Sequence, residues 1–503
     1  MIETPIENGL PLISMMLSTL AIGTLLIWIA PHRFKARHLA LISVLITLAF
    51  TLAILAGFDP STSAFQFVEK HSWIPTLQIN YFVGVDGISV LFLPLTSLLF
   101  LGIILSSWTR IRAMPRLYFS LLLVLLAATL GTFCALDTIL FFLFWETTLI
   151  PVYFLVSHWG HGPRRRYAAS KYTLHMLASG IPLLLAFVLL AINHADITAS
   201  GQDYLLNFDY PTLIDTPVSA TLQTALFFLF LLGFAPKVPL FPFHSWLPTI
   251  AIDGSGTTAA WVTGLKLGVY GLIRYLVPLT PDATVNFHWL LAGLGTLGMI
   301  YGALMALAQT NLRSMLAYAS VSHVGLVVLS LASLTLSGIQ GSLFQLVNFT
   351  IVAGGLYLLS GFLHHRTGST ESLSLGGLAT TKPLFSAFFF LLCIAGLGIP
   401  GTNGFPAEFL MIVSALETHT GAGLAALGIM VISAAYVLNL FRKAFLGPAR
   451  YGLIIQAEDL RPRELAIAIS LAVFVLVLGL FPGLVLDLMK VSAEAWVARV
   501  NGG

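Results

Sequence analysis

Long apolar stretches recur from one end of the sequence to the other, and they constrain the fold more than any other feature. Each stretch has roughly 18 to 25 residues, enough for a helix to cross about 30 Å of hydrocarbon. Of the 503 residues, 57% are hydrophobic and only 9% are charged, unlike the composition of a soluble domain. The sequence therefore predicts an all-α membrane protein that crosses the bilayer many times.

These stretches predict about fourteen transmembrane helices. The seventh and twelfth are too long, and too rich in proline and glycine, to be straight rods. The predicted spans are 12–30, 38–57, 87–108, 117–136, 138–158, 173–193, 222–247, 251–275, 286–309, 315–333, 342–363, 384–416, 422–446 and 464–488.

The basic residues alternate between the two sides of the predicted helices. Those that follow odd-numbered helices are Arg33, Lys35, Arg37, Arg110, Arg112, Arg116, Arg164, Arg165, Arg166, Lys171, Arg313, Arg366, Lys382, Arg442, Lys443, Arg450, Arg461 and Arg463. The opposite side holds only Lys70, Arg274, Lys490 and Arg499. The positive-inside rule therefore predicts a multi-pass protein of the cell inner (plasma) membrane with both termini outside. The net charge of +3 comes from basic residues spread over several short loops, where they set the topology. Because they form no single basic face, we expect no nucleic acid among the partners.

The sequence lacks the motifs that hold redox cofactors. Its two cysteines, Cys134 and Cys393, lie far apart in apolar spans, where packing is the expected role. It has no haem attachment motif, no cluster of four cysteines and no glycine-rich phosphate loop beside a strand. We therefore expect no cofactor and no metal, which disfavours a redox enzyme that works alone.

Four charged residues lie within predicted membrane helices: Glu146, Lys237, Lys266 and Glu408. A charge at the centre of such a helix costs about 2.5 to 3.5 kcal/mol, and residues of this kind typically mark ion pathways. Burial favours the neutral form of a lysine, whereas a nearby carboxylate favours the charged form, so moving Glu146 relative to Lys237 would switch the lysine. The alternative is a permanent ion pair that only joins two helices.

Histidines are weaker candidates, because a histidine on an apolar helix is as often a packing residue as a proton carrier. His323 is the best placed, since it lies in the middle of LAYASVSHVGLVVLS beside hydroxyl groups such as those of Tyr318 and Ser320. His244, near the cytoplasmic end of the seventh span, is expected to be mostly interfacial.

Two predicted helices are broken at corresponding places. Prolines at 236, 239 and 242 interrupt the seventh, and lipid tolerates such a break only where protein or water satisfies the freed carbonyls. The twelfth contains GLGIPGTNGFPAEF, and its FPAE resembles the FPFH of the seventh. Matching breaks five helices apart predict two inverted five-helix repeats, helices 4–8 and 9–13. The predicted domains are 1–116 with helices 1–3, 117–275 and 286–446 as the two repeats, and 447–503 with helix 14.

Five motifs in a fixed order resemble the antiporter-like subunit M of bacterial NADH:quinone oxidoreductase, complex I, whose mitochondrial counterpart is NADH dehydrogenase chain 4. They are FFLFWETTLIPVYFLVSHWGHGPRRRYAASKYTL, KVPLFPFHSWLP, LKLGVYGLIRY, AYASVSHVGL and GIPGTNGFPAEF. The likeness extends from about Gly84 to the last helix. It implies a fourteen-helix subunit of the membrane arm that binds neither quinone nor NADH and translocates protons while other subunits perform the redox chemistry. Its implied partners are L-like and N-like antiporter subunits and the lipid bilayer.

The resemblance also implies roles for single residues. By motif match, the residues of the family's proton route are Glu146 in the fifth helix, Lys237 in the broken seventh, Lys266 in the eighth, His323 in the tenth and Glu408 in the twelfth. Lys171 matches a lysine of the sixth helix, near the cytoplasmic side where protons would be taken up.

The sequence departs from the family pattern at two places. After HSWLP it reads TIAIDGSGTTAAW, about two residues shorter and without the usual acidic and histidine residues, for which Asp253 compensates only in part. Asn348 stands where subunit M usually has a histidine, and an asparagine holds water but carries no proton charge. The adjoining TIVAGG also departs, so the connection between Lys266 and Glu408 is the least well supported section. These differences favour a divergent paralogue.

Two other interpretations remain open at this point. The four membrane charges are shared with subunits of multisubunit cation/proton antiporters, membrane-bound hydrogenases and inorganic-carbon-uptake complexes, so they leave the choice between proton and sodium open. A non-conducting structural spacer is the second alternative, motivated by Asn348 and the altered loop at 249–260.

Overall fold

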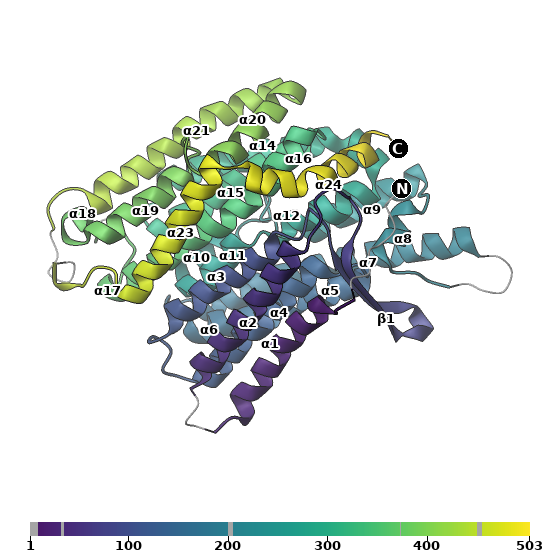
Figure 1. Ribbon diagram of the computed structural model, residues 1–503. Helices are drawn as coiled ribbons and strands as arrows, with labels where there is room; N and C mark the ends of the chain where they lie inside the picture. Colours follow the sequence, from purple (N-terminus) through teal and green to yellow (C-terminus); the bar gives the residue numbers. More distant parts are fainter. Residues whose placement is uncertain (1–8, 32–34, 200–204, 373, 450–454, 503) are drawn as a thin grey trace.

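The computed structural model describes residues 9–31, 35–199, 205–372, 374–449 and 455–502, so Arg33 and Arg450 of the topology argument lie outside the described residues. The described chain is a bundle of helices with one small hairpin (Figure 1), which confirms the predicted all-α class. Within these ranges, 11 helical runs are long and apolar enough to span a membrane, and shorter apolar helices occupy Phe92–Ser107, Ala220–Phe234 and Pro383–Ala395. The count of fourteen crossings and the inverted repeats remain predictions.

The first half of the bundle begins with long, unbroken helices. Exposed apolar side chains such as Ile22, Leu177 and Leu185 cover their outer faces, as expected for surfaces that meet lipid acyl chains. The elements are α1 (Leu12–Ile29), α2 (Ala36–Ala56), α3 (Phe92–Ser107), α4 (Pro115–Cys134), α5 (Thr138–Thr147), α6 (Leu149–Trp159), α7 (Arg165–Thr198), the short α8 (Tyr210–Asp215) and α9 (Ala220–Phe234).

The second half follows the first break in the chain. Its elements are α10 (Trp246–Asp253), α11 (Gly256–Gly264), α12 (Leu267–Gly271), α13 (Val277–Leu279), α14 (Pro281–Ala308), α15 (Leu312–Leu331), α16 (Leu336–Asn348), α17 (Gly354–Thr367), α18 (Leu378–Thr381), α19 (Pro383–Ala395), α20 (Gly404–Thr418), α21 (Thr420–Leu440), α23 (Pro462–Leu480) and α24 (Gly483–Asn501). Wider π-turns continue three of these helices: η2 (Leu272–Leu276), η3 (Phe349–Ala353) and η4 (Phe441–Phe445).

Both predicted helix breaks are confirmed. The chain is non-helical between the end of α9 at Phe234 and the start of α10 at Trp246, where the prolines remove backbone donors. It is non-helical again between α19 and α20, where Gly398 and Gly401 have φ angles of 63° and 89°. Left-handed backbone of this kind suits glycine and ends a helix.

A third break, which the sequence analysis does not predict, lies at Lys266. This residue separates α11 from α12 and has φ −91° and ψ 61°, outside the helical range. Its surroundings, LKLGVYG, contain no proline. A Cβ atom added to Gly268 would stand 2.6 Å from the carbonyl carbon of Lys237, so the third break is pressed against the first. The helix break at Lys266 therefore coincides with a tertiary contact to Lys237, and no proline beside it explains the break.

The predicted helix at 464–488 is wrong at its C-terminal end. Helix α23 ends at Leu480, and α24 begins as a separate helix at Gly483 after Phe481 and Pro482. Proline cannot continue a preceding helix, which explains the turn. Helix α24 then packs against α13, α14 and α16, and runs beside α16 towards the C-terminus in Figure 1.

The hairpin of β1 (Gln66–Ile74) and β2 (Ile79–Val85) is the only sheet in the described ranges, and the sequence analysis predicts no strand there. Its strands are antiparallel and joined by a short 3₁₀ turn, η1 (Pro75–Leu77). The Glu69 carboxylate accepts a hydrogen bond from the backbone N–H of Ile13 at 2.9 Å. Because the first N–H groups of a helix lack internal partners, this contact ties the hairpin to the start of α1.

Candidate functional site

Lys237 occupies the first break and is only 7% exposed. Its Nζ donates to the carbonyl oxygen of Trp145 at 3.1 Å and to Oγ1 of Thr148 at 3.0 Å. The same Nζ stands 3.8 Å from the centroid of the Trp145 ring, a favourable position for a cation. Thr148 separates α5 from α6, so Lys237 joins two helix interruptions.

Glu146 lies one residue from Trp145 but does not contact the lysine. Its Oε1 is buried without a hydrogen-bond partner and lies against Gly180 of α7, where a Cβ atom would stand 2.5 Å away. No nitrogen–oxygen pair between Glu146 and Lys237 lies within 4.0 Å in the described residues. In this conformation the two charges are neighbours without being a direct ion pair.

Lys171 contacts the second half of the broken helix. Its Nζ donates to the carbonyl oxygen of Ser245 at 2.8 Å and to Oγ1 of Thr249 at 3.3 Å. Ser245 directly precedes α10, so this lysine of α7 holds the start of that helix. Glu146, Lys171 and Lys237 therefore surround one break, although they come from three different segments.

His244, which the sequence analysis expects to be mostly interfacial, is buried among other side chains. The residue is 6% exposed and its Nδ1 has no hydrogen-bond partner. Its ring centroid lies 5.7 Å from that of Phe241 and 4.9 Å from that of Tyr301 on α14. His244 lies in the non-helical segment between α9 and α10, where the prolines interrupt the helix.

Lys266 forms the centre of a second group. It is 4% exposed, and its Nζ donates to Oγ of Ser320 on α15 at 2.7 Å. The Nζ also stands 5.1 Å from the ring centroid of Phe349, the residue that follows α16. The Lys266 ammonium therefore has one hydroxyl partner and one aromatic face among the described residues.

His323 and Glu408 face each other across α15 and α20. The Nδ1 of His323 lies 3.3 Å from Oε1 of Glu408, and the glutamate is 2% exposed. Gly398, with φ 63°, makes room for this carboxylate, because a Cβ atom there would collide with Oε2 of Glu408. The second predicted break therefore provides the space that the glutamate occupies.

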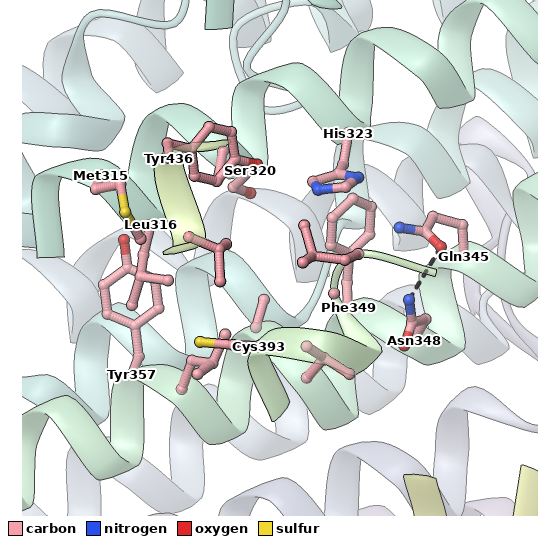
Figure 2. Close-up of a pocket in the computed structure, with 17 residues that line it drawn as sticks. Met315, Leu316, Ser320, His323, Gln345, Asn348, Phe349, Tyr357, Cys393 and Tyr436 are labelled. Atoms are coloured by element: carbon pink, nitrogen blue, oxygen red, sulfur yellow. Dashed lines mark hydrogen bonds between the residues drawn. The ribbon is translucent and has the colours of Figure 1, made fainter. Parts of the chain in front are cut away.

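Two cavities flank His323. The first offers about 60 Å³ to the centre of a water-sized sphere and is shown in Figure 2 with Ser320, His323, Gln345, Asn348 and Phe349 in its lining. The second, with about 20 Å³ of such space, is lined by His323 and Glu408 among others. His323 thus stands between a cavity that reaches the hydroxyl partner of Lys266 and one that reaches Glu408.

The structure brings the six predicted residues into two groups: Glu146, Lys171 and Lys237 at the first, and Lys266, His323 and Glu408 at the second. The backbone contact between Gly268 and Lys237 makes the two groups adjacent. Sequence reasoning does not identify Thr148 or Gln345, because a hydroxyl or an amide in a helix gives no signal of its own. Within the described residues, no three His, Cys, Asp or Glu side chains are arranged to hold a metal ion.

The sequence analysis also does not identify one of the basic residues as a buried charge. Arg274, which the topology argument places on the outer side, is 5% exposed and lies within η2. Its Nη1 and Nη2 donate to the two carboxylate oxygens of Asp86 at 2.8 Å and 2.5 Å. The partners are 188 positions apart, so nothing local in the sequence pairs them. Unlike Lys237 and Lys266, this charge is fully paired.

Comparison with known proteins places these features in a family. Residues 135–433 match the family described as NADH:quinone oxidoreductase/Mrp antiporter, TM. The NADH-quinone oxidoreductase subunit M of Rhodobacter capsulatus is 34% identical over 477 residues, which are 93% of this chain and 91% of that protein.

Solved structures agree with this assignment. A chain of respiratory complex I from Thermus thermophilus with bound NADH superposes with a TM-score of 0.88 at 28% identity, over 97% of this chain and 99% of that chain. A chain of the Mrp complex from a Dietzia species shares the fold with a TM-score of 0.82 at 21% identity, over 96% of this chain and 51% of that chain. The chain therefore belongs to the NADH:quinone oxidoreductase/Mrp antiporter membrane family, together with antiporter-like subunit M.

Proposed function

We propose that this chain is a proton-translocating, antiporter-like subunit in the membrane arm of an NADH:quinone oxidoreductase. It acts as a translocase within the enzyme complex, moving protons from the cytoplasm to the outside, and carries no redox centre of its own. The observation that carries this proposal is the pair of buried lysines, each at a helix break and neither in a direct ion pair. Buried, unpaired lysines exchange protons more readily than paired ones, because burial favours their neutral form.

The proposed route uses both groups of residues. Protons are taken up from the cytoplasm near Lys171 and reach Lys237 at the first break. They pass over water to Lys266 at the adjacent third break, and then through the cavity to His323. Glu408 receives them and releases them to the outside. The Lys266–Ser320 hydrogen bond, the His323–Glu408 contact and the two cavities between them support the second half of this route.

The proposed organisation follows from the matching breaks. Residues 117–275 and 286–446 form the two inverted repeats, 1–116 precedes them and 447–503 follows. The break between α9 and α10 in one repeat corresponds to that between α19 and α20 in the other. In a bacterial plasma membrane, both termini lie outside and the neighbours are L-like and N-like antiporter subunits of the same complex.

Coupling to distant redox chemistry is proposed to be electrostatic. Glu146 lies beside the segment that binds Lys237 and has an unpaired buried oxygen. Moving its carboxylate towards the lysine would favour the charged lysine, and moving it away would favour proton release. A displacement of Glu146, transmitted between neighbouring subunits, therefore acts as the switch.

Replacing Glu146 with glutamine tests this switch. Glutamine keeps the shape of the side chain but removes the charge, so coupled turnover is expected to fall roughly tenfold, within the usual range of coupling between sites. The measurement is NADH-driven proton translocation by the assembled complex in proteoliposomes. Unchanged turnover and pumping in Glu146→Gln would eliminate the switch while leaving the proton route in place.

Lys237→Ala and Glu408→Gln test the proposed function itself. Each removes a proton-carrying group, so proton translocation through this subunit is expected to fall about 100-fold or more. The measurement is protons moved per electron pair in proteoliposomes that contain the whole complex. Lys443→Ala, at an exposed lysine, is the control and is expected to match the parent. If both variants pump as many protons per electron pair as the parent, the chain is a structural spacer.

A subunit of a multisubunit cation/proton antiporter is the second candidate, favoured by the shared fold with the Mrp complex. The two candidates differ in what drives transport. In membranes that contain the intact assembly, NADH oxidation drives proton translocation by the first, whereas an imposed sodium gradient drives it in the second. Proton movement in response to sodium alone, with no response to NADH, would select the antiporter.

A further inference from the structure

The cavity between Lys266 and His323 carries a pair of amide side chains that the route above leaves without a role. Gln345 and Asn348 are one turn apart on α16, so they share a face of the helix. The Nδ2 of Asn348 donates to Oε1 of Gln345 at 3.1 Å, the dashed line in Figure 2. Both residues are 2% exposed and both line the cavity.

This amide pair gathers with the histidine at one end of the cavity. Figure 2 places His323, Gln345 and Asn348 together, whereas Met315 and Tyr357 lie at the opposite end. The remaining lining is largely apolar and includes Leu316, Val352 and Leu397. His323 and the two amides therefore gather at one end of the cavity, and Ser320 lies on the other side of His323 in this view.

The hydrogen bonding of the pair is incomplete. Oδ1 of Asn348 is buried and has no hydrogen-bond partner. Gln345 uses its amide oxygen in the bond to Asn348, which leaves its N–H groups as donors. Buried polar groups in folded proteins are nearly always paired, with ordered water where protein groups do not reach. The pair thus offers an acceptor and a donor to molecules inside the cavity.

The dimensions of the cavity suit water. About 60 Å³ of it is open to the centre of a water-sized sphere, and one water needs roughly 10 to 15 Å³ of such space and two to four polar partners. Ser320, His323, Gln345 and Asn348 supply these partners on neighbouring sides. Ser320 is hydrogen-bonded to Lys266, and His323 contacts Glu408, so water held here would connect both ends of the second group.

We propose that the Gln345–Asn348 pair positions water in this cavity for proton transfer between Lys266 and His323. The two amides do not carry the proton; they hold the water that does. This inference rests on the proposed function. It makes Gln345 and Asn348 positioning residues. It also explains how a route through Asn348 conducts although that side chain has no titratable group.

Four variants of the assembled complex test the proposal by NADH-driven proton translocation in proteoliposomes. Asn348→Leu and Gln345→Leu put branched apolar side chains in place of the amides and remove the hydrogen-bonding groups, and each is expected to lower the rate about tenfold. Asn348→His restores hydrogen bonding at the same position and is expected to stay within about twofold of the parent. Thr350→Val is the matched control, because Thr350 donates to the carbonyl of Gly264 but does not line this cavity.

The outcomes distinguish a role of the two amides in positioning water from a role in packing alone. A parent-like rate in both leucine variants would overturn the proposal, and so would a rate in Asn348→His as low as in Asn348→Leu. Electron transfer from NADH to an artificial acceptor, which other subunits perform, reports on assembly in every variant. If Asn348→Leu does not assemble, Gln345→Leu removes the other half of the pair and decides the question.

A reference variant distinguishes failure of this inference from failure of the proposed function. Lys266→Met removes the proton-carrying group itself and is measured beside the four variants. If Lys266→Met is slow while both leucine variants match the parent, only the role of the amides is rejected. If Lys266→Met also matches the parent, proton transfer by this chain is rejected with it.

Discussion

Replacing Arg274 with methionine is expected to prevent stable assembly of the subunit. The substitution leaves Asp86, itself 4% exposed, as an uncompensated buried carboxylate. Removing one partner of a buried ion pair costs about 3 to 5 kcal/mol, a large share of the stability of a typical protein. The rings of Phe65, Tyr210 and Tyr270 also lose the guanidinium, whose carbon stands 5.4 to 5.7 Å from their centroids. The measurement is the amount of subunit in the intact complex on native gels.

Two further variants identify the cause of this loss. The double variant Asp86→Leu with Arg274→Met removes both charges, and it is expected to recover part of the assembled complex because no unpaired charge remains. Arg461→Met makes the same type of change in the exposed pair between Arg461 and Glu458, whose side chains are 60% and 72% exposed, and is expected to have little effect. Equal loss in the single and double variants would contradict the unpaired carboxylate as the cause.

Replacing Lys266 with methionine is expected to stop proton translocation through this subunit while the complex still assembles. Methionine matches the length of the lysine stem and keeps the contact with Phe349, but it cannot bind a proton. Removing a group that transfers protons typically lowers a rate about 100-fold or more. The measurement is the initial rate of NADH-driven acidification on the far side of the membrane, compared with electron transfer to quinone.

The hydroxyl of Ser320, which lies beside Lys266, allows a variant with a smaller expected effect. Ser320→Ala keeps Lys266 but removes the acceptor 2.7 Å from its Nζ, so a loss of about tenfold is expected, smaller than that of Lys266→Met. Lys443→Met changes an exposed lysine in the same way and is expected to leave the rate unchanged. Proton translocation by Lys266→Met at the parent rate would contradict the assigned route.

Much of the fold could be predicted because the bilayer imposes a strict rule on the sequence. Backbone groups in hydrocarbon must be paired internally, so long apolar stretches have to be helices, and most of the described long helices overlap predicted spans, whereas α24 lies largely outside them. The breaks after α9 and α19 could also be predicted, since proline lacks an N–H and glycine tolerates left-handed backbone. The break at Lys266 could not, because no residue beside it forbids a helix and the contact with Lys237 comes from another part of the chain.

The same distinction applies to the candidate site, of which only some residues could be identified from the sequence. Charged residues in apolar helices stand out in the sequence, because burying them is costly, and Glu146, Lys237, Lys266 and Glu408 were identified in this way. Their partners do not stand out. Thr148, Ser320 and Gln345 are ordinary polar residues, and they become part of the site only through the hydrogen bonds and cavity that the packed helices create.

By itself, the sequence determined that this protein is a mainly helical membrane protein with charges inside its apolar spans and two helix breaks, because apolar length, proline and intramembrane charge are local properties. Only the tertiary structure decided which of those charges are paired. It joined Arg274 to Asp86 across 188 positions, left Glu146 and Lys237 apart, and set Gln345 and Asn348 beside the cavity that His323 shares. Pairing depends on distances between helices that are remote in sequence, and packing alone sets those distances.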